Sequence, residues 1–178
     1  MTNAAWSHFV AQGYGRVVMT TSGTALFGLP RQAHHTAAKG AVIGMTRSLT
    51  VEARSLGDIK VNVVAPAAYT RMADTTPDAA TRAHLEQHTR PEQVAPVVAW
   101  LAHERCGAEG QVFYAGGGWV ARVFFAIAPG FTDVDLSIED IAEHWDQICA
   151  EDGYAVPEDS IAAVAFGMRD TPAGSPAR

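Results

Sequence analysis

The sequence contains few cysteines, and it lacks long apolar runs and a targeting pattern. Its 178 residues include two cysteines, Cys106 and Cys149, which lie far apart and outside a C-x-x-C spacing. We therefore expect reduced thiols in a cytosolic protein rather than a disulfide. No apolar run reaches the roughly 18–20 residues that cross a bilayer, and the first residues are not a basic segment followed by an apolar one. These absences predict a cytoplasmic protein without a membrane span.

Positive charge is also scarce in this sequence. The 13 Lys and Arg residues stand against 19 Asp and Glu residues, which gives a formal net charge of -6 at pH 7 without any run of basic residues. Nucleic acids and anionic membranes select for basic patches, so we expect neither as a partner. The hydrophobic fraction of 48% and the charged fraction of 18% are ordinary for a globular domain with a core.

Hydrophobic periodicity predicts alternating helices and strands. The expected strands are 16–20, 59–65 and 111–115, followed by an extended apolar segment at 119–126. The expected helices are 2–12, 33–56, 78–89, 91–104 and 138–149, the last of them capped by Ser137. A strand, a long helix and a second strand form a βαβ unit, which implies parallel strands and an α/β fold. We assign the α/β domain to residues 1–150. A mostly irregular tail is expected at 151–178, disordered from residue 171 on, because Gly, Pro, Ala and Asp dominate there.

The stretch from Val17 to Lys39 carries the residues with the clearest chemical potential. Ser22 follows the expected strand, and Lys39 lies one helical turn after His35 on the expected helix. A hydroxyl at the end of a strand and an ammonium on the next helix can converge on one small cavity. The sequence therefore predicts a site built from Ser22, His35 and Lys39.

Two other interpretations are weaker. A Ser–His hydrolase based on Ser22 and His35 fails because TTSGT lacks the G-x-S-x-G pattern and no third acid is indicated. His84 and His88 are four residues apart on an expected helix, a spacing that can chelate zinc. The segment is polar on all sides and has no H-E-x-x-H pattern, so we expect solvated histidines and no metal site.

The spacing of these residues resembles the active-site motif of the short-chain dehydrogenase/reductase superfamily. That motif is Tyr-x-x-x-Lys with a Ser thirteen residues before the Tyr, and Ser22 lies thirteen residues before His35. The flanking stretches GRVVMTTSG, FGLPRQA, AAKGAVIGMTRSL and IKVNVVAPAAYTRM also look like that family. RPEQVAPVVAWLAHERC and GQVFYAGGGWVARV are similar to the hydroxyacyl-CoA dehydrogenase unit of the peroxisomal multifunctional enzymes of type two. The resemblance covers about residues 1–150. It implies a partial Rossmann-like doubly wound parallel sheet, made of the last three strands and flanking helices of that fold.

The resemblance also implies roles for individual residues. In the family a Tyr phenol donates a proton to the substrate carbonyl while NAD or NADP carries the hydride. By position, Ser22 would orient the carbonyl oxygen, and Lys39 would hold the nicotinamide ribose. Thr70 matches a hydroxyl on the carboxamide side, and Val64 and Pro66 line up with the turn beside the nicotinamide. The expected catalytic residues are Ser22, His35 and Lys39, and the expected cofactor-binding residues are Lys39, Val64, Pro66 and Thr70.

Three departures from the family pattern lead us to expect an inactive isolated chain. His35 replaces the Tyr, and an imidazole has a reference pKa of about 6.5 rather than about 10. Ala67 replaces a Gly. The glycine-rich loop that binds the pyrophosphate at a helix N-terminus is not found upstream of Val17, and Gly116–Gly118 is followed by an apolar, strand-like segment. Binding of NAD(P)H by the chain alone should therefore be negligible.

Two hypotheses follow for function. The first is an oxidoreductase of the 3-hydroxyacyl-CoA or hydroxysteroid dehydrogenase type that becomes active when a separate or upstream polypeptide supplies the nucleotide-binding half. The second is a non-catalytic association module that pairs with a full-length dehydrogenase or a neighbouring enzyme. Strand 16–20 would have an open apolar edge, which favours pairing with another chain. The resemblance implies homo- or hetero-oligomers formed through the helices at 2–12 and 33–56.

Overall fold

The computed structural model describes residues 1–71 and 78–170. Two compact units are present, residues 1–123 and residues 124–178, and each is treated by itself below. The predicted domain boundary at residue 150 stays a prediction. The disorder expected at 171–178 lies outside the described residues.

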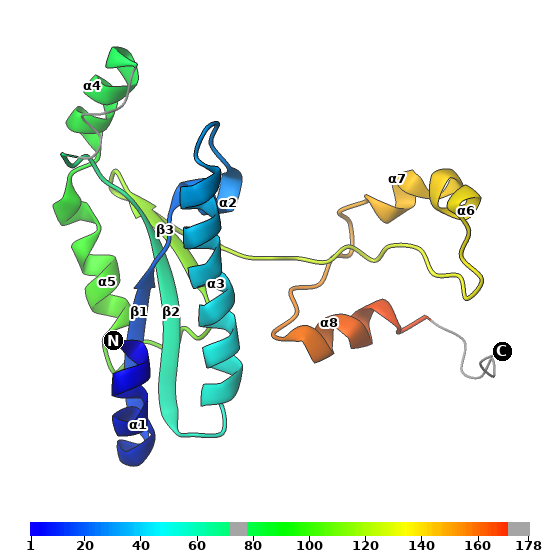
Figure 1. Cartoon of the computed structure of the whole chain (residues 1–178), viewed down its shortest axis with the longest axis horizontal. Helices are drawn as coiled ribbons and strands as arrows, with labels where there is room; N and C mark the ends of the chain where they lie inside the picture. The colour runs from blue at the N-terminus through cyan, green and yellow to red at the C-terminus, as the bar shows by residue number, and fades with distance from the viewer. Residues whose placement is uncertain (72–77, 171–178) are drawn as a thin grey trace. The chain divides into compact units, whose positions relative to one another are not determined.

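A four-stranded sheet forms the centre of the first unit (Figure 1). Its strands are β1 (Tyr14–Thr20), β2 (Asp58–Ala67), β3 (Val112–Gly116) and β4 (Trp119–Val123), in the spatial order β1-β2-β3-β4. β2 pairs in parallel with both β1 and β3, as the predicted βαβ unit requires. The three predicted strands and the α/β class are therefore confirmed.

A fourth strand extends the three-stranded parallel sheet that we expected. β4 pairs antiparallel with β3, and Gly116 lies opposite Trp119. The two residues between them, Gly117 and Gly118, have φ values of 59° and 77°. Positive φ at both central positions is typical of a type I′ hairpin turn, which glycine adopts without a steric cost. Two glycines between two apolar runs are a hairpin signal. The extended segment expected at 119–126 forms strand β4 over its first five residues.

The helices of this unit are α1 (Thr2–Gln12), α2 (Gly23–Phe27), α3 (Ala33–Ala53), α4 (Ala79–His88), the 3-10 turn η2 (Pro91–Gln93) and α5 (Ala95–Leu101). Among them, α1 has the predicted bounds, α3 and α4 are shorter than predicted, and α2 was not predicted. The helix expected at 91–104 is thus divided into η2 and α5. Pro96 lies at the start of α5 and has no N–H to donate, so the helical hydrogen bonds begin again there.

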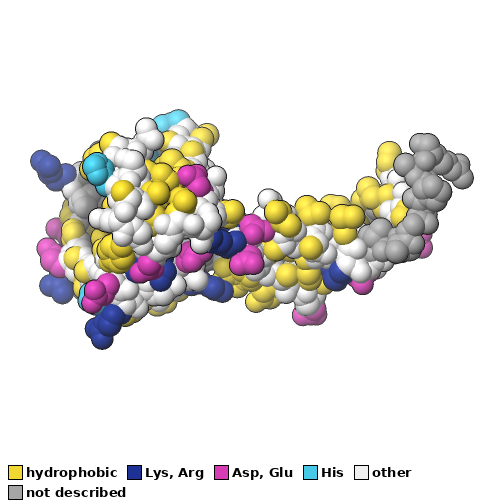
Figure 2. All heavy atoms as spheres, turned by 90° about the horizontal axis from the view of Figure 1, so that it is seen from below, with side chains coloured by type: hydrophobic (Ala, Val, Ile, Leu, Met, Phe, Trp, Pro, Cys, Tyr) yellow, Lys and Arg dark blue, Asp and Glu magenta, His cyan; other side chains and the backbone are white. Residues whose placement is uncertain are grey.

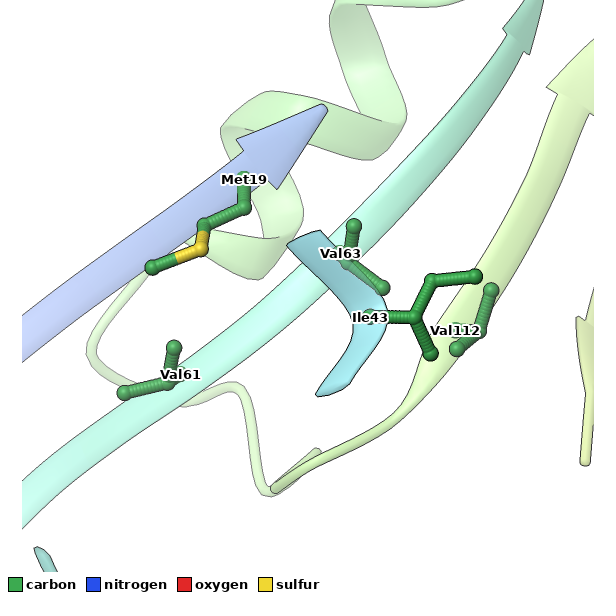
Figure 3. Packing of buried hydrophobic residues seen from close by; sticks show 5 residues of the cluster. All are labelled: Met19, Ile43, Val61, Val63 and Val112. Carbon is green, nitrogen blue, oxygen red and sulfur yellow. The ribbon is translucent and has the colours of Figure 1, made fainter. Parts of the chain in front are cut away.

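Helices cover both faces of the sheet, as a doubly wound fold requires. On one face, Ile43 of α3 packs against Val61 and Val63 of β2, together with Met19 and Val112 (Figure 3). The next residue, Val64, points to the other face. There it packs with Ala115 of β3 and with Val94, which precedes α5. This alternation along β2 buries both of its faces, which is the pattern of a central parallel strand.

The second unit differs because none of the residues from 124 to 170 is buried. It contains α6 (Ile138–Glu143), α7 (Trp145–Ile148) and α8 (Ser160–Gly167). Ser137 caps α6 in a capping box with Asp140, as predicted, but the expected helix 138–149 is interrupted at His144. α8 lies within the predicted irregular tail and was not anticipated. Hydrophobic side chains on this unit lie at the surface (Figure 2), with Ile138 81% and Ile161 79% exposed.

Within the described residues, no helix is both long and apolar enough to cross a bilayer.

The packing of Ile43 yields a stability prediction. Ile43→Ala should lower the free energy of unfolding by about 2–5 kcal/mol, because it removes a buried side chain and leaves a cavity between α3 and β2. Urea denaturation followed by circular dichroism measures this change. The same substitution at the exposed Ile161 is the control and should change stability by less than about 0.5 kcal/mol. Equal effects of the two substitutions would contradict the core described here.

An ion pair at the start of the sheet predicts a pH dependence. The Arg16 guanidinium lies 2.7 Å from the Asp58 carboxylate, and its hydrogen bond is the main cause that lowers the pKa of Asp58. Because the pKa of Asp58 is lower in the folded state, its ionised carboxylate stabilises the fold at pH values above the unfolded-state pKa of about 3.9. This contribution is lost as the pH falls through the folded-state pKa. Because Asp58 is half exposed, Asp58→Asn should cost about 1 kcal/mol at pH 7.

The difference between the wild type and Asp58→Asn should disappear at strongly acid pH. Denaturation curves at pH 7 and at pH values below the lowered folded-state pKa of Asp58 check this. Glu86→Gln, at an exposed position on α4 with no ion pair among the described residues, is the control and should show no such pH-dependent difference. A pH-independent loss in Asp58→Asn would mean that the Arg16 contact does not stabilise the fold through charge.

Candidate active site at the carboxyl ends of the parallel strands

The residues singled out from the sequence lie where the parallel strands end. Ser22 comes two residues after β1, Thr70 comes three residues after β2, and the Gly117–Gly118 turn follows β3. Parallel strands end at the same edge of a sheet, and open α/β sheets bind their ligands at that edge. The strand register therefore places these three segments on one side of the molecule.

Ser22 is held by the first turn of α2. It is the N-cap residue, with φ of -150° and ψ of 149°, and its Oγ accepts a hydrogen bond of 3.3 Å from the Thr24 N–H. The Thr24 hydroxyl lies 3.0 Å from the same Oγ. A hydroxyl has one proton and two lone pairs, so Ser22 retains hydrogen-bonding capacity toward a ligand.

Lys39 is attached to the end of β1 at both its side chain and its backbone. Its Nζ donates to the Thr20 carbonyl at 3.1 Å, and its own carbonyl accepts from the Thr21 hydroxyl at 2.7 Å. Thr21 is buried, and its N–H donates to the Val64 carbonyl at 2.8 Å. The structure therefore brings the Lys39 ammonium beside the two residues that precede Ser22.

His35 lies on α3 one helical turn before Lys39, so the two side chains share a face of the helix. A bond of 3.4 Å from the Thr36 hydroxyl to the Thr24 carbonyl joins this end of α3 to α2, which Ser22 caps. The imidazole is half buried, and no hydrogen bond to it occurs within the described part of the chain. The three predicted catalytic residues thus belong to one neighbourhood, formed by the end of β1, α2 and the start of α3.

The predicted cofactor-side residues divide into two groups. Val64 is 2% exposed, and its side chain belongs to the core rather than to the surface of the site. Pro66 lies near the end of β2 and lines a largely apolar hollow of about 520 Å³, together with residues of the α5 side such as Val98. Thr70 is exposed, and the neighbouring Tyr69 N–H donates to the Thr89 carbonyl at 2.6 Å.

These residues fit one end of a nicotinamide cofactor. The Lys39 ammonium and the Thr70 hydroxyl are groups that hydrogen-bond a ribose or a carboxamide. Across residues 1–71 and 78–170, no glycine-rich strand–turn–helix segment is available to hold a pyrophosphate. The described residues therefore offer polar groups suited to the nicotinamide end of the cofactor.

The histidine pair on α4 does not develop into a metal site. The rings of His84 and His88 lie 4.6 Å apart between centroids, and both side chains are exposed. Within the part of the chain that the structure describes, no group of three or more His, Cys, Asp or Glu residues could hold a metal ion.

Tyr114 and Thr21 are functional candidates that sequence reasoning missed. Tyr114 of β3 reaches the turn after Ser22, where a Cβ on Gly23 would lie 2.7 Å from the phenol oxygen. Thr21 anchors α3, as described above. Thr21 could have been suspected from its place next to Ser22, whereas nothing in the local sequence links Tyr114 to a residue about ninety positions earlier.

Comparison with known proteins agrees with this geometry. The family model described as enoyl-(acyl carrier protein) reductase matches residues 1–120. A short-chain type dehydrogenase/reductase of Mycobacterium tuberculosis is 42% identical over 146 residues, which cover 82% of this chain and 49% of that protein. Peroxisomal multifunctional enzyme type 2 of Mus musculus is 33% identical over 163 residues, covering 89% of this chain and 21% of that protein.

A solved structure leads to the same family. Full-length peroxisomal multifunctional enzyme type 2 from Drosophila melanogaster matches with a TM-score of 0.77 and 25% identity over 94% of this chain and 30% of its own. The chain thus spans between about a fifth and a half of the proteins it matches. Members of this family typically use NAD(P). On its family match, its relatives and its fold, the chain belongs to the short-chain dehydrogenases/reductases.

Proposed function

We propose that this chain forms the substrate-side half of an NAD(P)-dependent dehydrogenase or reductase. Its substrate would be a 3-hydroxyacyl or 3-oxoacyl thioester, with a hydroxysteroid as the second possibility. The observation that carries this proposal is the attachment of Lys39 to Thr20 and Thr21, directly before Ser22. A hydroxyl and an ammonium, both located at the carboxyl end of the same parallel strand, are the polar groups that a carbonyl substrate and a nicotinamide ribose need.

The residues of the chain would bind and orient the reactants. The Ser22 hydroxyl donates a hydrogen bond to the substrate carbonyl oxygen, where negative charge develops during reduction. Lys39 holds the ribose and adds positive charge beside that oxygen. When bound, the nicotinamide supplies or accepts the hydride. Its nucleotide-binding half would come from polypeptide outside these 178 residues.

The thioester class rests on what the relatives are called. The matching family model is described by a reductase that acts on acyl carrier protein thioesters, and relatives in mouse and fly are peroxisomal multifunctional enzymes. At this end of the sheet, Pro66 and Val98 also line a largely apolar hollow, which lies on the α5 face and not beside Lys39 of α3.

An association module remains the second candidate, and the open edge of the sheet favours it. Among the strands of residues 1–71 and 78–170, β1 pairs with β2 alone, so its other edge leaves backbone groups available for pairing. Beside this edge, Ala5, Phe9 and Val17 line a largely apolar hollow of about 510 Å³. Both candidates require another polypeptide at this edge, and they differ in whether the completed assembly turns over substrate.

The cytoplasmic location expected from the sequence stays a prediction.

Binding of NAD(P)H to the purified chain distinguishes a site with only the nicotinamide contacts from a complete cofactor site. Calorimetry with the purified chain should give no measurable heat of binding for NADH or NADPH, because contacts to the pyrophosphate and adenosine are not provided by the described residues. Micromolar binding would overturn the half-site proposal. The mass of the chain in the same sample, measured by light scattering, identifies the species tested.

Replacing His35 with the Tyr that the family has at this position tests whether the site can catalyse reduction. With the amino-terminal half of a related reductase supplied in trans, His35→Tyr should raise the reduction rate of acetoacetyl-CoA by about 10²–10⁴-fold over the wild type, the usual contribution of general acid catalysis. His34→Tyr, one position earlier on α3 and exposed, is the matched control and should leave the rate unchanged. If both variants stay inactive although the assembly binds NADPH, the association module becomes the better candidate.

We further propose that α3 mediates self-association. Its outward face carries exposed small or apolar residues at helical spacing, opposite the buried Ile43 and Thr46: Ala37, Ala41, Gly44, Met45 and Val51. Small residues permit close helix packing, so Ala41→Glu should shift the chain toward the monomer by placing a charge in the contact. Light scattering measures the shift, and Gln87→Glu on α4 is the control. An unchanged oligomer in Ala41→Glu would exclude this face.

A further inference from the structure

Tyr114 reaches the candidate active site from β3. Its ring lies among aromatic neighbours, 6.4 Å from Phe27 of α2 and 5.7 Å from Trp119 of β4 between centroids. Tyr114 is half buried, whereas Phe27 is 72% and Trp119 is 57% exposed. Three rings from three elements therefore form an aromatic cluster, and Tyr114 at its centre approaches the turn that carries Ser22.

The phenol oxygen of Tyr114 makes the closest approach to that turn. A Cβ added to Gly23 would lie 2.7 Å from the hydroxyl oxygen and 2.8 Å from Cε2 of the ring. Side chains do not tolerate such distances, so the phenol can occupy this place only because residue 23 is glycine. Gly23 directly follows Ser22 and is the first residue of α2. The two hydroxyls thus belong to the same small region at the end of β1.

The hydroxyl of Tyr114 has no hydrogen-bond partner among residues 1–71 and 78–170. A half-buried phenol normally finds one, from the protein, from water or from a ligand. If the side chain served packing alone, a ring without a hydroxyl would pack equally well, and the hydroxyl beside Gly23 would form no favourable interaction. An unpaired donor beside Ser22 is instead suited to an oxygen atom of the substrate.

We propose that Tyr114 contacts the substrate and donates a hydrogen bond to the carbonyl oxygen that Ser22 also holds. This inference rests on the dehydrogenase function proposed above and adds a residue to its site. A carbonyl oxygen has two lone pairs and accepts two donors, which together stabilise developing negative charge. The site then draws its phenol from β3, whereas the family takes its phenol from the position that His35 occupies on α3.

Binding of two matched thioesters tests this assignment. Acetoacetyl-CoA carries the 3-oxo group, and butyryl-CoA is the same thioester without it. The dissociation constants of both are measured from the tryptophan fluorescence of the full chain, in which Trp119 lies next to Tyr114. The ratio of the two constants reports the 3-oxo group alone, so a merely structural role of Tyr114 would not change it.

The wild type should prefer acetoacetyl-CoA, and Tyr114→Phe should reduce that preference by about two- to tenfold, the usual worth of one hydrogen bond. Gly23→Ala should act in the same direction, because the added Cβ displaces the phenol while leaving it in the chain. Tyr154→Phe removes an exposed phenol in residues 124–170 and should leave the preference unchanged.

Each other outcome has a distinct meaning. If Tyr114→Phe keeps the full preference while Ser22→Ala loses it, the assignment of Tyr114 is overturned and the proposed function stands. If the wild type shows no preference for the 3-oxo group, or binds neither thioester, the proposed substrate site fails and the role of Tyr114 fails with it.

Discussion

The parallel pairing of β2 with two neighbours is the constraint on which the rest of the structure depends. Val61, Val63 and Ala65 are fully buried in this strand, and the neighbouring side chains alternate between the α3 face and the α5 face. A slip by one residue would turn each of these side chains to the opposite face of the sheet, so packing on both faces specifies the register. The register in turn brings the ends of β1, β2 and β3 to one edge, where the candidate active site lies.

A short series of hydrogen bonds connects the candidate site to this core and fixes the positions of its residues. Thr21 donates its N–H to Val64 of the central strand and its hydroxyl to the carbonyl of Lys39 on α3. The buried threonine therefore joins the strand and the helix at the level of the reactive groups, and Ile43 packs the same helix onto the sheet one turn further on. A site held by a strand end and a packed helix is more rigid than one built on loops, which suits the orientation of a carbonyl group.

Sequence reasoning identified most of this architecture for a physical reason. β2 and α3 have strong periodicity, so their type and order were predictable, as was Ser137 as a cap. The roles of Ser22 and Lys39 as site residues stay predictions. The division of the helix at Pro96 and the hairpin at Gly117–Gly118 depend on single residues that interrupt hydrogen bonding or allow positive φ, and their effect on pairing was underestimated. Tyr114 was inaccessible to such reasoning, because its relation to Ser22 is created by tertiary packing rather than by spacing along the chain.

The local structure around Ser22 and Lys39 does not require a Tyr at position 35, where this chain has His35. The sheet, the threonine anchor and the serine turn do not depend on the side chain at position 35, because its imidazole makes no hydrogen bond within the described residues. Having His rather than Tyr at position 35 therefore leaves the framework of the proposed carbonyl site intact. Gly23 admits a second phenol to the same framework from β3, and its hydroxyl lies against the residue that follows Ser22. A carbonyl oxygen bound there would meet hydroxyl donors from two different elements, which is the arrangement that stabilises an oxyanion.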